Sequence, residues 1–118
     1  MKENIVAIKS YAFALRIVNL YKYLVNEKHE YVLSKQILRS GTAIGANIEE
    51  AIGGQSDRDF ISKLAIAYKE TRETRYWINL LRDAKYLQPN FAESLLFDCE
   101  EICRIIGKIQ ITMKNKSS

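Results

Sequence analysis

The residues best able to do chemistry in this 118-residue chain are its acidic side chains and its one histidine. In helical bundles, two metal ions are bound by two Glu-x-x-His motifs and two further inward-facing glutamates. The chain has no Glu-x-x-His sequence, and we expect His29 to lie in a loop. Glu49 and Glu50 are neighbours, so on a helix they point about 100° apart and cannot both reach one ion. We therefore expect no metal, and interpret these acids as a solvated or ion-paired face.

Covalent catalysis has no better support in the sequence. Cys99 and Cys103 are four residues apart in a helical pattern, and His29 lies too far away to activate either thiol. A disulfide between successive turns of one helix would gain little, because the loop it closes is already ordered. We expect two reduced core thiols. The pair Gly41 and Gly45 lacks the strand and the lysine of a phosphate-binding loop. The sequence thus predicts a protein that is not an enzyme and needs no cofactor.

The same glycines indicate close packing. They lie inside a helical pattern that runs from Leu38 to Ala51. Each glycine inside a helix costs about 1 kcal/mol relative to alanine. Two within five positions therefore indicate that another backbone or a partner comes close, and we favour helix packing over direct ligand contact.

Positive charge is the remaining candidate for binding chemistry. The chain has 18 Lys and Arg against 14 Asp and Glu, a net charge of +4, which suits RNA or DNA but does not require either. Basic side chains can neutralise phosphates without reading sequence, or they can simply keep a bundle soluble among acidic neighbours. The candidate nucleic-acid contacts are Lys63, Lys69, Arg72, Arg75, Arg82 and Lys108, with Lys114 and Lys116 beyond them.

Residues 69–77 combine both signs of charge with aromatic side chains. Lys69 and Glu73 are one helical turn apart, as are Glu73 and Trp77, so pairing along a solvated face is one interpretation. A tryptophan beside arginines is also the usual composition of a subunit contact. Trp77 thus either anchors a contact between subunits or covers part of the surface of its own bundle.

Four amphipathic segments must position these residues. Apolar residues that recur every three or four positions predict helices over about 4–26, 31–53, 57–86 and 90–114. No segment alternates with a period of two for long enough to form a strand. Short connections between long helices predict one all-α domain over residues 1–118, an antiparallel up-down-up-down four-helix bundle.

The sequence also predicts the ends and faces of the helices. Ser56 and Asn90 are expected N-caps, and Gly53-Gly54, a pair that tolerates a left-handed backbone, is expected to end the second helix. The first helix has two apolar stripes, wide enough together to meet more than one neighbour. The stripes are Ile5, Ile8, Ala12 and Leu15, and Phe13, Ile17, Leu20 and Leu24. The predicted core face of the second helix contains Leu33, Ile37, Ile44, Ile48 and Ile52, and that of the fourth contains Phe91, Leu95, Cys99, Ile102, Ile106, Ile109 and Met113.

Composition agrees with a globular domain outside the membrane. Hydrophobic residues make up 47% and charged residues 27% of the chain. No run of about 18 apolar residues is present. The N-terminus has no signal-peptide core, so we expect a cytoplasmic protein.

Two long motifs resemble a known family. Gln36-Ile-Leu-Arg-Ser-Gly-Thr-Ala-Ile-Gly-Ala-Asn-Ile-Glu-Glu-Ala51, followed by residues 59–77 and Leu80-Leu81, closely resembles the bacterial four-helix-bundle family encoded in 23S rRNA intervening sequences. The similarity extends from about Tyr11 to Lys114. The family's motif positions correspond to Arg39, Ser40, Gly41, Thr42, Gly45, Asn47 and Glu50, and to Asp59, Phe60, Lys63, Leu64, Lys69, Glu70, Glu73, Thr74, Arg75 and Trp77.

The resemblance implies a bundle that assembles into a ring, typically a homopentamer with a central channel. The accessory variability proteins of diversity-generating retroelements look like relatives, and those are basic pentamers that bind nucleic acid. We therefore expect a non-enzymatic oligomeric bundle that contacts RNA or DNA through basic residues. The alternative is a structural oligomer or protein-binding adaptor without nucleic acid. The residues expected to pack or to form the oligomer are Arg39, Ser40, Gly41, Thr42, Gly45, Asn47, Glu50, Glu70, Glu73 and Trp77.

Overall fold

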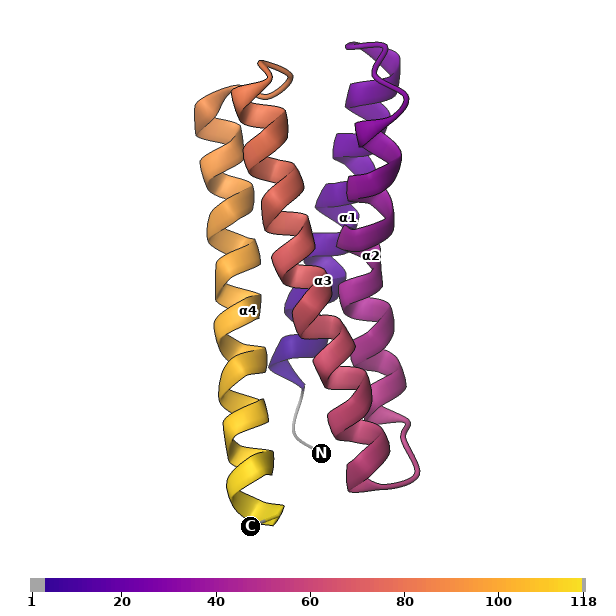
Figure 1. The fold of residues 1–118 in the computed structure, drawn as a ribbon. Helices are drawn as coiled ribbons and strands as arrows, with labels where there is room; N and C mark the ends of the chain where they lie inside the picture. The colour runs from indigo at the N-terminus through magenta and orange to yellow at the C-terminus, as the bar shows by residue number, and fades with distance from the viewer. Residues whose placement is uncertain (1–3, 118) are drawn as a thin grey trace.

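Four helices joined by short turns make up the protein in a computed structural model that describes residues 4–117 (Figure 1). They are α1 (Ile5–Asn26), α2 (Leu33–Ile52), α3 (Asp57–Asp83) and α4 (Pro89–Ser117). The helices run alternately up and down in a bundle of 48 × 24 × 20 Å. Helix α2 packs between α1 and α3, and α4 packs mainly on α3 and only lightly on α1. The predicted all-α antiparallel four-helix bundle is confirmed.

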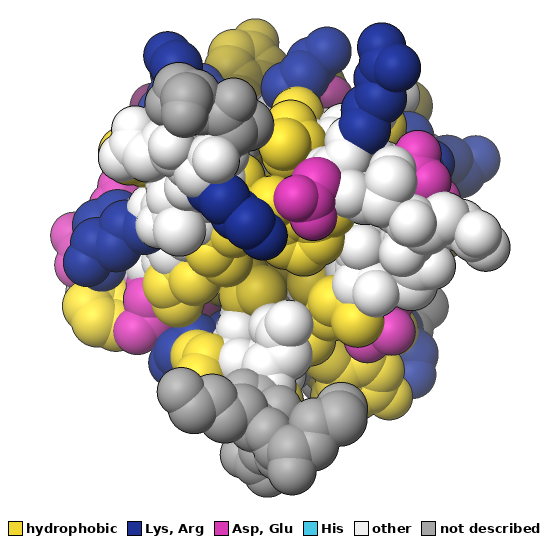
Figure 2. All heavy atoms as spheres, turned by 90° about the horizontal axis from the view of Figure 1, so that it is seen from below, with side chains coloured by type: hydrophobic (Ala, Val, Ile, Leu, Met, Phe, Trp, Pro, Cys, Tyr) yellow, Lys and Arg dark blue, Asp and Glu magenta, His cyan; other side chains and the backbone are white. Residues whose placement is uncertain are grey.

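One stripe of each helix forms the core. The largest buried side chains are Phe13, Ile17, Leu20, Leu24, Ile37, Ile44, Ile48, Leu64, Ile78, Leu81, Leu95 and Ile102. Viewed from the end that carries the α2–α3 turn, apolar side chains occupy the centre and charged side chains surround them (Figure 2). Two threonines of α3, Thr71 and Thr74, are buried in the same stripe. The Thr74 hydroxyl lies 2.8 Å from the Glu70 carbonyl and 2.9 Å from Ser40 Oγ, so its polar group keeps hydrogen bonds inside the bundle.

Helix α1 buries only one of its two predicted apolar stripes. The stripe of Phe13, Ile17, Leu20 and Leu24 is buried, as expected. The other stripe faces outward, with Ile5, Ile8 and Leu15 exposing 54%, 50% and 52% of their surface. Among residues 4–117, no other helix covers it, because α2 and α4 both pack on the side that carries the first stripe. The expectation that α1 meets neighbours with both stripes is therefore not met within one chain.

Two further residues assigned to the core by periodicity lie outside it. Ile52 at the end of α2 and Phe91 in the first turn of α4 are both exposed. Ala92 is buried in place of Phe91, and the Phe91 ring lies 5.6 Å from the Arg16 guanidinium. Near a helix end few neighbours surround the side chain, so the apolar period alone does not decide burial.

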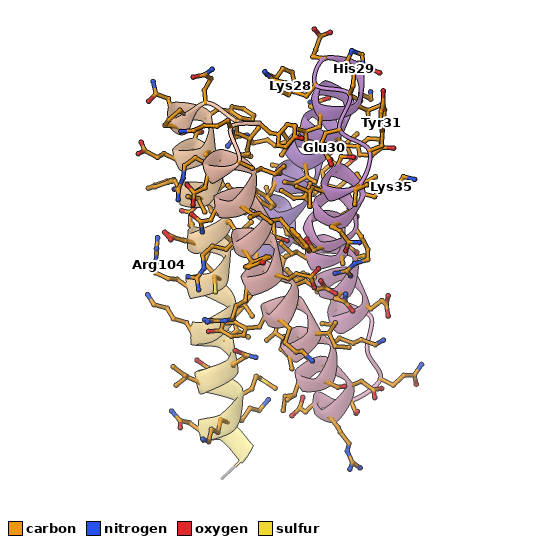
Figure 3. The ribbon with its side chains drawn as sticks, turned by 45° about the horizontal axis from the view of Figure 1, so that its top comes forward. Lys28, His29, Glu30, Tyr31, Lys35 and Arg104 are labelled. Atoms are coloured by element: carbon orange, nitrogen blue, oxygen red, sulfur yellow. The ribbon has the colours of Figure 1, made fainter. Side chains whose placement is uncertain are left out.

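A buried glutamate determines where α2 begins. Glu30 Oε2 accepts hydrogen bonds from the backbone N–H groups of Val32 (3.1 Å) and Leu33 (2.9 Å), and Oε1 accepts one from Ser34 (2.6 Å). These donors have no partner within the helix, so the carboxylate caps them. Glu30 is 8% exposed and lies in the turn at the top of α1 and α2 (Figure 3). Burial raises the pKa of Glu30, but the hydrogen bonds from Leu33, Ser34 and Val32 outweigh it and hold the pKa below its ordinary value.

The other helix ends partly follow the predictions. Ser56 is confirmed as the N-cap of α3, and its Oγ accepts a hydrogen bond from the Asp59 N–H (3.1 Å). The N-cap predicted at Asn90 is wrong, because α4 already begins at Pro89 and proline favours the first helical position. The stop predicted at Gly53-Gly54 is confirmed, since α2 ends at Ile52 and Gly53 is its C-cap, with φ −83°.

Helix α3 ends earlier than predicted. Its last residue is Asp83, and Lys85 follows with φ 73°. The Tyr86 N–H donates to the Leu81 carbonyl (2.9 Å), which is the hydrogen bond that closes a helix through a left-handed residue. Within residues 4–117, no helix has the length and apolar character needed to cross a membrane.

Candidate interaction surfaces

A polar cluster joins α2 to α3. Both terminal nitrogens of Arg39 lie close to the Glu70 carboxylate (3.1 and 3.2 Å), and Nη2 also lies 2.5 Å from Glu73 Oε2. The Trp77 indole N–H donates to the same Glu73 oxygen (3.0 Å). This hydrogen bond from Trp77, followed by that from Arg39, holds the pKa of Glu73 below its ordinary value. Four of the predicted motif residues thus meet inside one chain.

The cluster corrects one predicted pair. The Glu73 carboxylate is shared by Arg39 and Trp77, and it makes no ion pair with Lys69. Trp77 is half-buried and packs edge-on against Tyr76, with ring centroids 5.1 Å apart. Because Arg39 remains half-exposed, we assign the cluster to orienting α2 against α3 and expect it to contribute no more than about 1 kcal/mol to stability.

Small residues of α2 allow close approach to its neighbours. A Cβ added at Gly41 would lie 2.8 Å from Ile17 of α1, closer than real Cβ atoms come. A Cβ at Gly45 would lie 3.4 Å from Ser10 Oγ, an ordinary contact. Ser40 is fully buried beside α3. The glycine segment thus lies against α1 and α3 within the bundle.

The remaining motif residues of α2 make local contacts. The Thr42 hydroxyl donates to the Leu38 carbonyl (2.7 Å), and the Asn47 amide donates to the Ala43 carbonyl (2.8 Å). Glu50 forms an ion pair with Lys63 of α3 (2.8 Å). These contacts occur within the helix or between α2 and α3.

An apolar face extends over α1 and α2 on the outside of the bundle. It contains the exposed side chains Ile8, Tyr11 and Leu15 of α1, and beside them a hollow of about 270 Å³. The hollow is lined by Ala7, Ser10, Tyr11, Ala14, Thr42, Gly45, Ala46 and Glu49. We call this surface the α1–α2 face. Lys9 and Arg16 lie on the side of α1 that faces α4, where they are paired with Glu101 and Asp98.

A second hollow, the α3–α4 groove, has a different chemistry. It has a volume of about 530 Å³ and is lined by Tyr68, Arg75, Glu100, Cys103, Arg104, Gly107, Lys108 and Ile111. Three cations and one carboxylate are among these residues. Arg75 and Lys108 were candidates from the sequence, whereas Arg104 was missed. In the sequence Arg104 is an isolated charge within an apolar segment, and only the packing of α3 on α4 brings it near Arg75.

The other candidate nucleic-acid contacts are distributed differently. Lys63 is paired with Glu50, and Arg82 is paired with Asp83 (2.9 Å). Lys69 and Arg72 are exposed on α3 but do not line the groove. The structure therefore brings together two of the six candidates, Arg75 and Lys108.

The two cysteines differ in environment. Both are free thiols; Cys99 is buried, and Cys103 is half-buried in the α3–α4 groove. Cys99 Sγ donates to the Thr71 carbonyl (3.3 Å), and burial raises the pKa of this thiol to about 12. Among residues 4–117, no three His, Cys, Asp or Glu side chains are grouped so as to hold a metal ion. His29 lies in the α1–α2 turn, with Nδ1 3.2 Å from the Tyr31 hydroxyl.

The architecture and the α2–α3 cluster define the class of protein, an antiparallel four-helix bundle whose two middle helices are joined by its motif residues. A sequence model of the 23S rRNA-intervening sequence protein family matches residues 2–108, and the chain belongs to this family. This confirms the resemblance drawn from residues 36–51 and 59–77.

One solved structure is closely similar. It is the crystal structure of a protein with unknown function from the S23 ribosomal protein family of Bacteroides thetaiotaomicron. The two chains are 55% identical, and the match covers 93% of this chain and 98% of the other with a TM-score of 0.90. A search of curated proteins found no significant match.

Proposed function

We propose that the protein is a non-enzymatic bundle that self-associates through the α1–α2 face and binds RNA or DNA through its basic residues. The observation that carries the proposal is the second apolar stripe of α1. A helix on the surface of a bundle normally exposes a polar face opposite its core stripe, whereas α1 exposes Ile8, Tyr11 and Leu15 there. Self-association would cover that side.

The α1–α2 face is large enough for a stable contact. Helix α1 has 22 residues, so its length is roughly 33 Å. With α2 beside it at an interaxial distance of about 8–10 Å, the face measures roughly 33 by 20 Å. Two copies would then bury roughly 1,200 Å², which lies in the range of specific interfaces.

A second copy of the chain is the occupant that suits this face. Tyr11 protrudes with 68% of its surface exposed, and the adjoining hollow is lined mainly by Ala, Gly, Ser and Thr. A protruding aromatic side chain and a hollow of small residues therefore occur side by side on every copy. The resemblance to a ring-forming family supports the same occupant and gives five as the expected number of copies. Because a face that pairs with itself closes at two copies, a ring of five uses a further contact surface on each copy.

Measurement of the molar mass in solution tests the self-association. We expect the wild-type protein to have a mass of five times the 13.6 kDa of the chain in light scattering. Tyr11→Glu and Leu15→Glu should both reduce it toward one chain. The matched control is Phe97→Glu on α4, where the side chain is 66% exposed, and its mass should not change. A wild-type monomer at all concentrations would contradict self-association, and dissociation only by Phe97→Glu would place the contact elsewhere.

A salt titration tests the nucleic-acid part of the proposal. Several copies of a chain with a net charge of +4 attract a polyanion more strongly than one copy does. Binding through phosphates should weaken linearly in a plot of log affinity against log salt. If a labelled RNA or DNA oligonucleotide does not bind even at about 50 mM salt, a structural oligomer or adaptor is the better description.

A further inference from the structure

We propose that the α3–α4 groove is the nucleic-acid site and that Arg75, Arg104 and Lys108 hold the phosphodiester backbone there. This inference rests on the proposed function, since it assumes that the protein binds nucleic acid. Of the three residues, Arg104 is the one that the sequence did not point to.

The cations of the groove differ from many others on the bundle in their ion pairing. Each of several basic residues lies within 4.0 Å of a carboxylate, namely Lys9, Arg16, Arg39, Lys63, Arg82 and Lys116. Arg75, Arg104 and Lys108 pair with no carboxylate that the structure describes, although Glu100 lines the same groove. A phosphate can therefore approach them without breaking an existing ion pair.

The groove also has the form of a backbone site. Arg104 and Lys108 are one helical turn apart, so they lie on one side of α4 with Cβ atoms about 6 Å apart. Arg75 comes from α3, so cations line the groove from both helices. Arg104 extends outward from α4, on the side away from α2 (Figure 3). A strand lying in the groove would have cations on both sides of its backbone.

The chemistry of the lining favours phosphate over bases. Three cations and Glu100 give the groove a net charge of +2, and no Asn or Gln side chain lines it to read adenine edges. Gly107 keeps part of the groove open, since an added Cβ would meet only the Tyr68 ring, at 3.9 Å. Recognition of the backbone alone predicts similar affinities for single-stranded RNA and DNA.

Two triple variants provide the main test. Arg75→Gln, Arg104→Gln and Lys108→Gln together remove the groove cations. The control, Lys22→Gln, Lys28→Gln and Lys35→Gln, removes the same charge near the α1–α2 turn, where Figure 3 shows Lys28 and Lys35. Affinities for fluorescent 20-nucleotide oligo(U) and oligo(dT) are measured by anisotropy over a range of salt concentrations.

The groove variant should lose at least about tenfold in affinity. Its salt slope should fall by about 2, because each single-strand phosphate contact contributes about 0.7. The control should change affinity less than about threefold, and oligo(U) and oligo(dT) should bind within about threefold of each other. Equal losses in both variants would overturn the groove assignment. A preference above about tenfold for either strand would overturn backbone-only recognition. If the wild type binds neither strand, the proposed function itself fails.

Cys103 offers a direct second readout in the unmodified protein. It lines the groove, whereas Cys99 is buried and remains protonated at neutral pH. Alkylation by iodoacetamide should therefore modify Cys103 first. Bound oligo(U) should slow this reaction at least about threefold, and added salt should restore it as binding weakens. An unchanged alkylation rate in the presence of saturating oligo(U) would overturn the inference even if the protein binds RNA elsewhere.

Discussion

At the scale of single residues, Glu30 has the clearest structural role, because one carboxylate satisfies three backbone N–H groups at the start of α2. Glu30→Gln would place amide donors against those N–H groups. We expect the free energy of unfolding at pH 7 to fall by about 1–2 kcal/mol, measured by urea denaturation. Glu27→Gln is the matched control, since Glu27 is exposed in the same turn, and it should change stability little.

The effect of Glu30 should also depend on pH. The pKa of Glu30 in the folded protein lies below the ordinary value of 4.5. A carboxylate of this kind stabilises the fold above its unfolded pKa, and the stabilisation is lost as the pH falls through its folded pKa. The stability difference between wild type and Glu30→Gln should thus be constant from about pH 8 to 5 and shrink below about pH 4.5. A difference that is undiminished at pH 3 would contradict the capping role.

A substitution of Arg39 can show whether its cluster makes contacts within one chain or between subunits. Arg39→Met removes the bridge to Glu70 and Glu73 and changes the surroundings of Trp77, the only tryptophan. We expect a shift in tryptophan emission and a loss of no more than about 1 kcal/mol in stability, with the molar mass unchanged. Loss of the oligomer in light scattering would show that this cluster joins subunits instead.

These residues also show what the sequence could not reveal. Glu30 follows Asn26, Glu27, Lys28 and His29, and such a polar run is typical of a solvated turn. Its burial depends on how the turn folds over the first residues of α2. Arg39 and Glu73 were identified as motif residues, but spacing along a chain does not tell whether two side chains meet within one molecule or between two.

At the scale of elements, periodicity predicted the four helices but not which face of α1 is covered. Both stripes of α1 have the same three-and-four spacing, and only the positions of α2 and α4 decide between them. Helix ends were less predictable, because caps such as Glu30 and the left-handed Lys85 depend on hydrogen bonds between segments. The α3–α4 groove likewise required two helices to be placed side by side.

The contact between α1 and α2 can be tested at Gly41, with Gly107 of α4 as a control. Gly41→Ala would place a methyl group 2.8 Å from Ile17 in the core, so we expect a loss of about 1–3 kcal/mol in unfolding free energy. Gly107→Ala is the control, because its methyl group would meet only Tyr68 at 3.9 Å. There the better helix propensity of alanine should stabilise by up to about 1 kcal/mol. Urea denaturation of both variants measures this, and equal effects would show that α2 does not pack tightly at Gly41.

At the scale of the whole molecule, the proposed self-association through the outward stripe of α1 would make stability depend on protein concentration. A contact made only by folded chains stabilises them by mass action, so the melting temperature of the wild type should rise as the protein is concentrated. We expect a rise of several degrees over a hundredfold range in calorimetry, and no rise for Leu15→Glu, whose charge would lie within the α1–α2 face. Phe97→Glu should keep the wild-type dependence. A wild-type melting temperature that is independent of concentration, together with a monomeric mass, would mean that α1 keeps its apolar face in water.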